Sequence, residues 1–371
     1  MMIIFYTLLS LFLIITPFLY FLRIFKHMKK SWRYTLSILT LIAIITLLIE
    51  VIFQPTSSLW FVWNNIINFY ILCSFCFFIW IGLYHLWCHI IHHKHHSFFI
   101  ICLLLVSISI TGLGYSSHFH KEITDYHVTI PKNTTLSSLK IAFISDIHIG
   151  SGTSPQQIKN LVDTLNQNQY DLICLGGDIF DENSPQDYIE QTLKILSAAH
   201  CKYGIYAVDG NHEKYISLSS QKLYQKYKIT YLNEKFVCID GLFNIIGRED
   251  VSLHSSTSID TICENMDNSL PTIVLDHNPG RYKENQKYAD IQLSGHTHAG
   301  QIFPGNVITN LLYDNDYGLL VQDHHSLIVS SGYGSWGFPI RFMTNCEYVE
   351  VVIFHKESKK VTVKKLSCKN P

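Results

Sequence analysis

The sequence predicts four N-terminal transmembrane helices followed by a globular α/β domain in which two β-sheets pack together. Apolar residues make up 48% of the 371 residues and charged residues only 15%, which is too apolar for an ordinary soluble protein. The apolar excess lies at the amino end, and after residue 114 short apolar runs alternate with amphipathic stretches. Turns rich in Asp, His and Gly follow several of those runs.

Four apolar stretches near the amino end are long enough to cross a bilayer. They are Ile3–Leu22, Tyr34–Phe53, Leu59–Leu83 and Phe98–Gly114. A hydrocarbon core about 30 Å thick needs about 20 residues of helix. The first stretch lacks the basic region and the small-residue cleavage site of a signal peptide. We therefore expect a membrane domain over residues 1–115 and a globular domain over residues 116–371.

Basic residues between the first two stretches set the expected orientation. Five of them lie there: Arg23, Lys26, Lys29, Lys30 and Arg33. The loop over residues 54–58 carries no charge, and basic loops stay in the cytoplasm. Four crossings then place the globular domain on the outer face of a bacterial-type inner or plasma membrane. A single miscounted span would invert this orientation.

The loop before Phe98 is rich in histidine. Four of its histidines would share one face of a helix: His85, His89, His92 and His96. Metal or haem ligation is one interpretation, and the other is a helix end whose histidines lie at the depth of the lipid headgroups. No carboxylate completes a site there, which favours the second interpretation.

Net charge and cysteine usage exclude some classes of function. The formal net charge of −1 argues against a nucleic-acid partner, which requires a basic surface. None of the ten cysteines has zinc-ligand spacing on a loop, and the spacing specifies no disulfide pairing.

The first half of the globular domain alternates strands and helices. Ser154, Pro155 and Gln157 have the pattern of a helix start, and this helix should reach Asn168. The other expected elements are strands Val128–Ile130, Leu139–Ser145, Leu172–Leu175 and Gly204–Val208 and helix Gln186–Ala199. Such alternation places polar turns at the carboxyl ends of the strands. We interpret His118, His120 and His127, in the connecting stretch and early strand, as surface residues.

From Tyr231 onward the expected strands are shorter, with less helix between them, which indicates a second sheet packed on the first. These strands are Phe236–Ile239, Phe243–Gly247, Thr272–Leu275, Ile291–Ser294, Ser326–Ser330, Tyr348–Phe354 and Lys360–Lys365.

Five polar turns, each after a strand-like run, carry the candidate chemistry. They are DIH at Asp146–His148, GGDIFD at Gly176–Asp181, GNHE at Gly210–Glu213, DHNP at Asp276–Pro279 and GHTH at Gly295–His298. One such turn is ordinary, since Asp, Asn, Gly and His are common where strands end. Five in one domain indicate a site.

The side chains of these turns suit two divalent metal ions. Seven are candidate ligands: Asp146, His148, Asp178, Asn211, His277, His296 and His298. Carboxylates, imidazoles and one carboxamide, without a thiolate, favour Mn²⁺, with Fe²⁺ or Zn²⁺ as alternatives. Seven ligands suit two ions about 3.5–4 Å apart, bridged by a carboxylate and by a hydroxide that attacks a phosphoryl group.

This set of motifs, in this order, resembles the calcineurin-like metallophosphoesterase superfamily over about residues 140–350. The phrases YGIYAVDGNHE, GHTHAGQI and SSGYGSWGFPIRF are similar to a membrane-associated branch with YkuE-like and YaeI-like phosphoesterases and the chlamydial type of UDP-2,3-diacylglucosamine hydrolase. The resemblance implies an αββα sandwich of two mixed sheets flanked by helices. The family often has GNHD in place of GNHE, and Gly in place of Ala299, but neither change touches a ligand.

The resemblance also implies a role for each site residue. One metal would be held by Asp146, His148, Asp178 and His298, and the other by Asp178, Asn211, His277 and His296, with Asp178 as the bridge. His212 would stabilise the phosphoryl oxygens or protonate the leaving group, and Asp181 would orient its imidazole. Arg341 would bind the substrate, whereas Arg248 and Arg281 are interpreted as solvated or structural.

These observations predict a membrane-anchored phosphohydrolase that cleaves a lipid-linked phosphoester or pyrophosphate. The candidate reaction is hydrolysis of UDP-2,3-diacylglucosamine in lipid A biosynthesis. Only about 25 residues separate the fourth apolar stretch from the central sheet, which keeps the site near the bilayer. The alternative is a catalytically silent membrane sensor or transport-associated protein that binds a phosphorylated ligand. A decayed enzyme would lack some ligands, and none is missing here.

Overall fold

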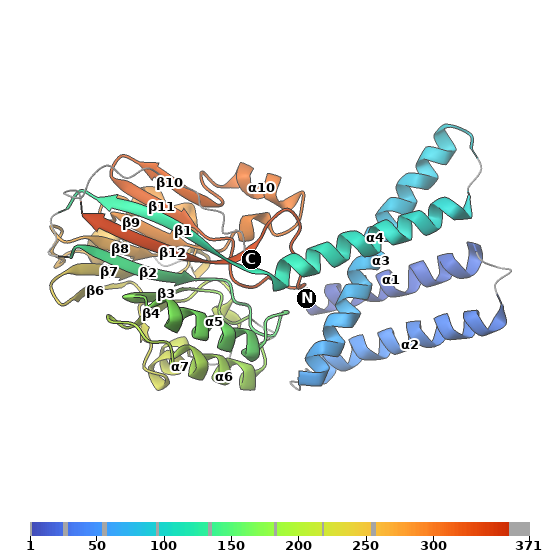
Figure 1. Ribbon diagram of the computed structural model, residues 1–371, viewed down its shortest axis with the longest axis horizontal. Coiled ribbons are helices and arrows are strands. Elements are labelled where there is room, and N and C mark those ends of the chain that lie inside the picture. The colour runs from blue at the N-terminus through green and yellow to red at the C-terminus, as the bar shows by residue number, and fades with distance from the viewer. Residues whose placement is uncertain are drawn as a thin grey trace. The chain divides into compact units, whose positions relative to one another are not determined.

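The chain divides into two compact units, Met1–Ser116 and Ser117–Pro371 (Figure 1). The structure, a computed structural model, describes residues 2–24, 29–53, 58–93, 96–132, 136–181, 184–216, 219–253 and 257–355. The expected strand Lys360–Lys365 lies outside these residues.

Four long helices begin in the first unit: α1 (Met2–Ile24), α2 (Lys30–Phe53), α3 (Ser58–Ile90) and α4 (Ser97–Phe119). The last three residues of α4 belong to the second unit. Within the described residues, two helical segments are long and apolar enough to cross a membrane, Phe61–Ile90 and Ser97–Phe119. The apolar segments Ser10–Arg23 and Arg33–Ile49, in α1 and α2, are shorter. Within the described residues the structure therefore supports two candidate spans where the sequence predicted four.

The histidine-rich segment at the end of α3 and the start of α4 does not gather its rings around one point. His85 Nε2 lies 2.8 Å from Tyr20 Oη of α1, and His89, His92 and His96 are exposed. Neither of the groups of metal-ligating side chains found in the described residues includes them. The geometry favours the interpretation of a helix end over that of a metal site.

Two six-stranded sheets form the second unit. The first has the order β1-β12-β2-β3-β4-β5, with strands β1 (Lys121–Ile130), β12 (Cys346–His355), β2 (Ser138–Ile144), β3 (Leu172–Gly176), β4 (Ile205–Val208) and β5 (Thr230–Tyr231). The strands β2 to β5 are parallel, and β12 is antiparallel to β2 but parallel to β1. The carboxyl ends of β2, β3 and β4 therefore meet at one edge.

The second sheet has the order β10-β11-β9-β8-β7-β6. Its strands are β6 (Lys235–Ile239), β7 (Phe243–Gly247), β8 (Thr272–Leu275), β9 (Ile291–Ser294), β10 (Gly318–Gln322) and β11 (His325–Val329). Strands β7, β8, β9 and β11 are parallel, and the outer strands β6 and β10 are antiparallel to their neighbours. Fully buried side chains of both sheets, such as Phe143 of β2 and Ile273 of β8, share one apolar core. The domain is thus an α/β domain of two packed mixed sheets.

Short helices flank the two sheets. In the first half of the domain they are α5 (Pro155–Asn168), α6 (Gln186–Leu196) and α7 (Ser220–Lys226), and in the second half α8 (Ile259–Ile262), α9 (Tyr282–Asn285) and α10 (Gly305–Leu312). Figure 1 shows α5, α6 and α7 together beside β3 and β4. The expected helix start is present, since Ser154 and Gln157 form a capping box ahead of α5.

The last described strand departs from the sequence-based assignment to the second sheet. β12 lies in the first sheet, inserted between β1 and β2. It pairs with β1 over ten residues, from Lys121 opposite Cys346 to Ile130 opposite His355. Strand length and apolar pattern do not encode which sheet a returning strand joins, because the partner lies far away in the sequence.

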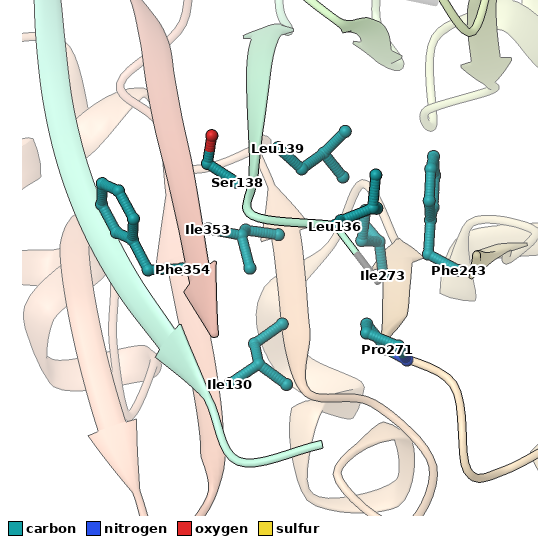
Figure 2. A pocket seen from close by; sticks show the side chains of 9 residues that line it. All are labelled: Ile130, Leu136, Ser138, Leu139, Phe243, Pro271, Ile273, Ile353 and Phe354. Carbon is teal, nitrogen blue, oxygen red and sulfur yellow. The ribbon is translucent and has the colours of Figure 1, made fainter. Parts of the chain in front are cut away.

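A small apolar hollow lies at the amino ends of the parallel strands, opposite the edge that carries the polar turns (Figure 2). Its volume is about 20 Å³, and Ile130, Leu139, Ile273 and Ile353 are among the residues that line it. A space of this size holds at most one water, and a water needs polar partners. We interpret the hollow as a packing gap between the sheets.

Candidate metal centre

Six of the seven sequence-predicted ligands meet at the carboxyl edge of the strands, in two groups. Within each group the ligating atoms lie within 4.8 Å of one another. One group is Asp146, His148 and His298, and the other is Asp178, His277 and His296. The seventh ligand, Asn211, joins the second group, since its Oδ1 lies 2.8 Å from His296 Nδ1.

The carboxylate of Asp178 lies between the two groups. Its Oδ2 is 3.0 Å from His277 Nε2 and 3.9 Å from His148 Nε2. In the first group, His298 Nε2 is 3.1 Å from His148 Nε2 and 3.3 Å from Asp146 Oδ1. This arrangement suits a bridging carboxylate with one ion on either side.

A buried nitrogen or oxygen atom without a hydrogen bond is a candidate metal-binding atom, so such atoms show whether these residues fit metal ions. His277 is fully buried, and its Nδ1–H donates to the carbonyl oxygen of Gly176 at 2.7 Å. Its Nε2 lies 3.0 Å from Asp178 Oδ2, but no hydrogen bond of good geometry satisfies it within the described part of the chain. A buried polar atom left unsatisfied costs about 1–3 kcal/mol, and a metal ion would use this lone pair. The backbone hydrogen bond to Nδ1 orients the ring for such ligation.

Five of the candidate ligands have a left-handed backbone. Their φ angles are 53° for Asp146, 46° for His148, 50° for Asp178, 74° for His296 and 51° for His298. This conformation is uncommon outside glycine and costs about 1–3 kcal/mol per residue. The strained residues are concentrated in the turns that carry the ligands. We infer that the backbone conformation of these turns is determined by the need to place the ligand side chains and not by local stability.

Charge and burial shift the pKa values of several groups in the cluster. Burial acts to raise the pKa of Asp178, but the charges of His277 and then His148 lower that pKa below the usual carboxyl range. Burial acts to lower the pKa of His277, but the charge of Asp178 raises it well above its usual value. Burial, followed by the charges of Arg341 and His148, lowers the pKa of His298 well below its usual value. The cluster thus pairs an ionised Asp178 with a charged His277 and keeps His298 neutral, and metal ligation would require His277 to release its proton.

Residues 139–300 match the family model described as calcineurin-like phosphoesterase. Over these residues the globular domain is similar to this family. The similarity is consistent with a metal-dependent phosphoesterase fold, and the two groups of candidate ligands suit two divalent metal ions.

Proteins similar to this chain occur in bacteria and animals. A metallophosphoesterase of Helicobacter pylori is 33% identical over 56% of this chain and 58% of its own length. The metallophosphoesterase YkuE of Bacillus subtilis is 26% identical over 64% of this chain and 87% of its own. A "transmembrane protein with metallophosphoesterase domain" of Danio rerio is 24% identical over 68% of this chain and 62% of its own. The chain therefore spans little more than half the length of the Helicobacter relative, and the similarity to YkuE agrees with the predicted branch.

Glycines beside the ligands let the phosphoesterase turns approach one another. A β-carbon on Gly210 would overlap Asp178 Oδ1, and one on Gly295 would overlap Asp146 Oδ2. The glycines of GNHE and GHTH thus make room for carboxylate oxygens of the other turns.

Glu213 of the GNHE turn has a role that the sequence interpretation missed. Its buried carboxylate accepts hydrogen bonds from the backbone N–H groups of Asp178 (3.0 Å), Ile179 (2.6 Å), Phe180 (3.1 Å) and Gly210 (2.8 Å). One side chain therefore ties the turn after β3 to the turn after β4. The signal in the sequence was the Glu that stands where the family often has Asp.

His212 lies beside the first group of ligands, and Asp181 contacts one of those ligands. The His212 ring is 5.2 Å from the ring of His148, and its backbone N–H donates to Asp178 Oδ1 at 2.8 Å. Asp181 Oδ2 lies 3.5 Å from His148 Nδ1 and accepts a hydrogen bond from Ser151. Asp181 is thus placed to orient His148, and the predicted orientation of His212 by Asp181 stays a prediction.

Arg341 lies behind the ligands in this structure, and its predicted contact with the substrate stays a prediction. It is fully buried, with Nη1 donating to the carbonyl oxygen of His298 at 2.7 Å and Nη2 lying 2.9 Å from His298 Nδ1. Nε and Nη2 also donate to Ser335 Oγ and to the carbonyl oxygen of Ser331. The guanidinium thus supports His298 from behind.

The other two arginines are structural, as expected. Arg248 is buried and pairs with Glu234 and Glu284, each at 3.3 Å. Arg281 pairs with Asp276 at 3.1 Å.

Proposed function

We propose that this chain is a membrane-anchored phosphohydrolase that uses two divalent metal ions, Mn²⁺ first among them, to cleave a lipid-linked phosphoester or pyrophosphate. The observation that carries the proposal is the position of Asp178 between two groups of buried ligands, 3.0 Å from His277 and 3.9 Å from His148. Oxygen and nitrogen ligands without a thiolate suit Mn²⁺.

Different residues of the chain would have different roles in hydrolysis. Two bound divalent ions supply charge for the phosphoryl oxygens and an activated water. The left-handed turns fix the ligands before substrate binds, and Asp181, 3.5 Å from His148 Nδ1, is placed to orient that ring. His212, next to the first group, is the residue we assign to the leaving group or the phosphoryl oxygens.

Membrane anchoring is supported by the candidate spans and by a relative's name. Phe61–Ile90 and Ser97–Phe119 are long and apolar enough to cross a bilayer, and β1 begins at Lys121, directly after α4. The Danio rerio relative is named as a transmembrane protein. With all four N-terminal helices crossing, the basic residues between Arg23 and Arg33 place the catalytic domain outside the cytoplasm, which is the orientation we propose. With only α3 and α4 crossing, the same basic residues place it in the cytoplasm. UDP-2,3-diacylglucosamine stays the named candidate substrate, although its hydrolysis requires a cytoplasmic domain.

A hydrolysis screen of the purified full-length protein tests the substrate class. Lipid-linked phosphates and pyrophosphates in mixed micelles are compared with their water-soluble counterparts at equal metal loading. We expect a higher kcat/KM for the lipid-linked compounds. An equal or higher value for the soluble compounds overturns the lipid part of the proposal, and no hydrolysis of any compound overturns the proposed function.

Reporter fusions after Pro371 test the orientation. Alkaline phosphatase activity at this position is the expected result, because that reporter is active outside the cytoplasm. Activity of a cytoplasmic reporter alone would reverse the proposed orientation and favour the nucleotide-lipid candidate.

A further inference from the structure

The helix α10 presents its apolar side to solvent. Thr309 Oγ1, on the side that faces the domain, donates to Asp316 Oδ2 at 2.6 Å. Val307 and Ile308 are about half exposed, and Leu311 and Leu312 are 80% and 73% exposed. In a soluble domain the apolar side of a helix faces the core, so this arrangement is inverted. An inverted amphipathic helix is typical of a surface that meets an apolar partner.

Neighbouring segments extend this apolar surface. Gln301, two residues before the exposed Phe303, exchanges two hydrogen bonds of 2.9 Å with the backbone of Trp336. The carbonyl oxygen of Gln301 also accepts from Phe342 N and Thr344 Oγ1, on either side of the exposed Met343. We call α10 patch the exposed side chains Phe303, Val307, Ile308, Leu311, Leu312 and Trp336.

The α10 patch borders the metal centre. α10 packs against the turn His298–Gly300, and the ring of Tyr313, directly after α10, is 6.1 Å from the ring of His296. On the other side, the Trp336 ring is 5.8 Å from the ring of His212. Figure 1 shows α10 beyond the ends of β10 and β11, outside the sheet layers. A molecule with its phosphate at the metal centre could therefore rest its apolar part on the patch.

We infer that the α10 patch is the surface with which the phosphoesterase domain contacts the acyl region of the bilayer while a lipid phosphate reaches the metal centre. The inference rests on the proposed function and adds to it the side chains that meet the lipid. Residues 302–313 include no charged side chain, so nothing in this segment opposes insertion into an apolar phase. Trp336 at its border is of the residue type enriched at membrane interfaces.

The end of α4 is the reason for naming the bilayer as the partner. His118 and Phe119, the last residues of α4, belong to the same compact unit as the patch. His118 Nδ1 lies 2.8 Å from Ser335 Oγ, and Ser335 directly precedes Trp336. The last turn of a helix that is apolar and long enough to cross a membrane is thus fixed one residue from the patch.

Photolabelling tests the contact without relying on activity. The full-length protein is placed in lipid nanodiscs that contain a phospholipid with a diazirine at the end of an acyl chain, and labelled residues are mapped by mass spectrometry. We expect label on residues 303–312 and none at Val321 of β10, which is also apolar and 61% exposed but lies toward the opposite end of the strands. No label on 303–312, or equal label at Val321, overturns the inference.

Kinetic measurements with a matched control variant test whether the contact between the α10 patch and the bilayer promotes hydrolysis of a lipid substrate. In the variant Leu311→Ser/Leu312→Ser, kcat/KM for a phosphatidic acid or lipid pyrophosphate in vesicles should fall about tenfold, because apolar burial at the bilayer is lost. The rate with bis(4-nitrophenyl) phosphate in solution should be unchanged, and Val321→Ser should change neither rate. Equal losses with both substrates would indicate a structural role of α10 and overturn the inference.

Two further outcomes separate the inference from its alternatives. If the wild-type protein hydrolyses neither substrate, the proposed function fails, and the photolabelling result alone decides the bilayer contact. If Leu311→Ser/Leu312→Ser halves the particle mass of the detergent-solubilised protein, the patch binds a second copy of the chain, and the inference is overturned.

Discussion

The two ends of the parallel strands in the phosphoesterase domain differ in almost every physical respect. At the carboxyl ends, five candidate ligands adopt left-handed backbone and buried carboxylates lie among imidazoles. At the amino ends, Leu139, Ile273 and Ile353 surround a hollow of about 20 Å³. The same strands thus carry strain and charge at one end and ordinary apolar packing at the other. Substitutions at the first end should change chemistry, and substitutions at the second should change only stability.

The largest effect is expected at the carboxylate between the two ligand groups. Asp178→Asn should reduce hydrolysis to background and lower the metal content, because a neutral amide is a poor bridge between two cations. Metal content is measured by plasma mass spectrometry beside the rate. A variant that keeps both metals and its rate would show that Asp178 does not bridge.

A smaller loss is expected for His212, which lies beside the ligands without belonging to either group. His212→Ala should keep the metal content and lower kcat about 10²–10⁴-fold, the usual range for a lost acid–base group. Complete metal loss in this variant would contradict its assignment to the substrate side.

Arg341 offers a further test of the comparison, because it is a buried residue that contacts His298, one of the candidate metal ligands. Arg341→Met removes the hydrogen bonds to His298, and losing such support costs about 10–100-fold in metal affinity. The matched control is Arg248→Met, which also removes a buried, ion-paired arginine. This control should lower the melting temperature without changing metal affinity, and equal metal losses in both variants would reduce the role of Arg341 to general stability.

The smallest effect is expected at the opposite end of the strands. Ile273→Val widens the hollow by one methylene and should lower the free energy of unfolding by about 0.5–1.5 kcal/mol. Chemical denaturation measures the change, and kcat/KM should equal that of the wild type. A clear loss of kcat/KM would show that the two ends are coupled through the core.

The local sequence predicted well which residues lie at the carboxyl ends of the strands as candidate ligands. It did not predict the distant residues that hold those ligands in position. The strands Thr272–Leu275 and Ile291–Ser294 form with the expected bounds, and the turns after them bring His277 and His296 into one group. Such features depend on neighbours in the sequence, namely an apolar run followed by a polar turn.

The contacts that the sequence did not predict involve residues that meet only in the folded domain. His118 was interpreted as a surface residue, yet it is fully buried against Ser335 and Gly152. Arg341 was assigned to substrate for its place in the GFPIRF phrase, and its hydrogen bond to His298 was not predicted. Each partner lies at least 34 residues away in the chain, and no local pattern of polarity records such a contact.

The place of β12 between β1 and β2 also sets an order of events during synthesis. β1 leaves the ribosome well before its neighbour β12, because about 215 residues lie between the two strands. At about 5–20 residues per second the wait is on the order of ten seconds or more, and until it ends the edges of β1 and β2 have no neighbour on that side. Each nascent chain therefore exposes two open strand edges until β12 pairs with them, and an open edge promotes pairing with other chains. The yield of folded protein should thus depend on how well the cell shields nascent chains, independently of the stability of the finished domain.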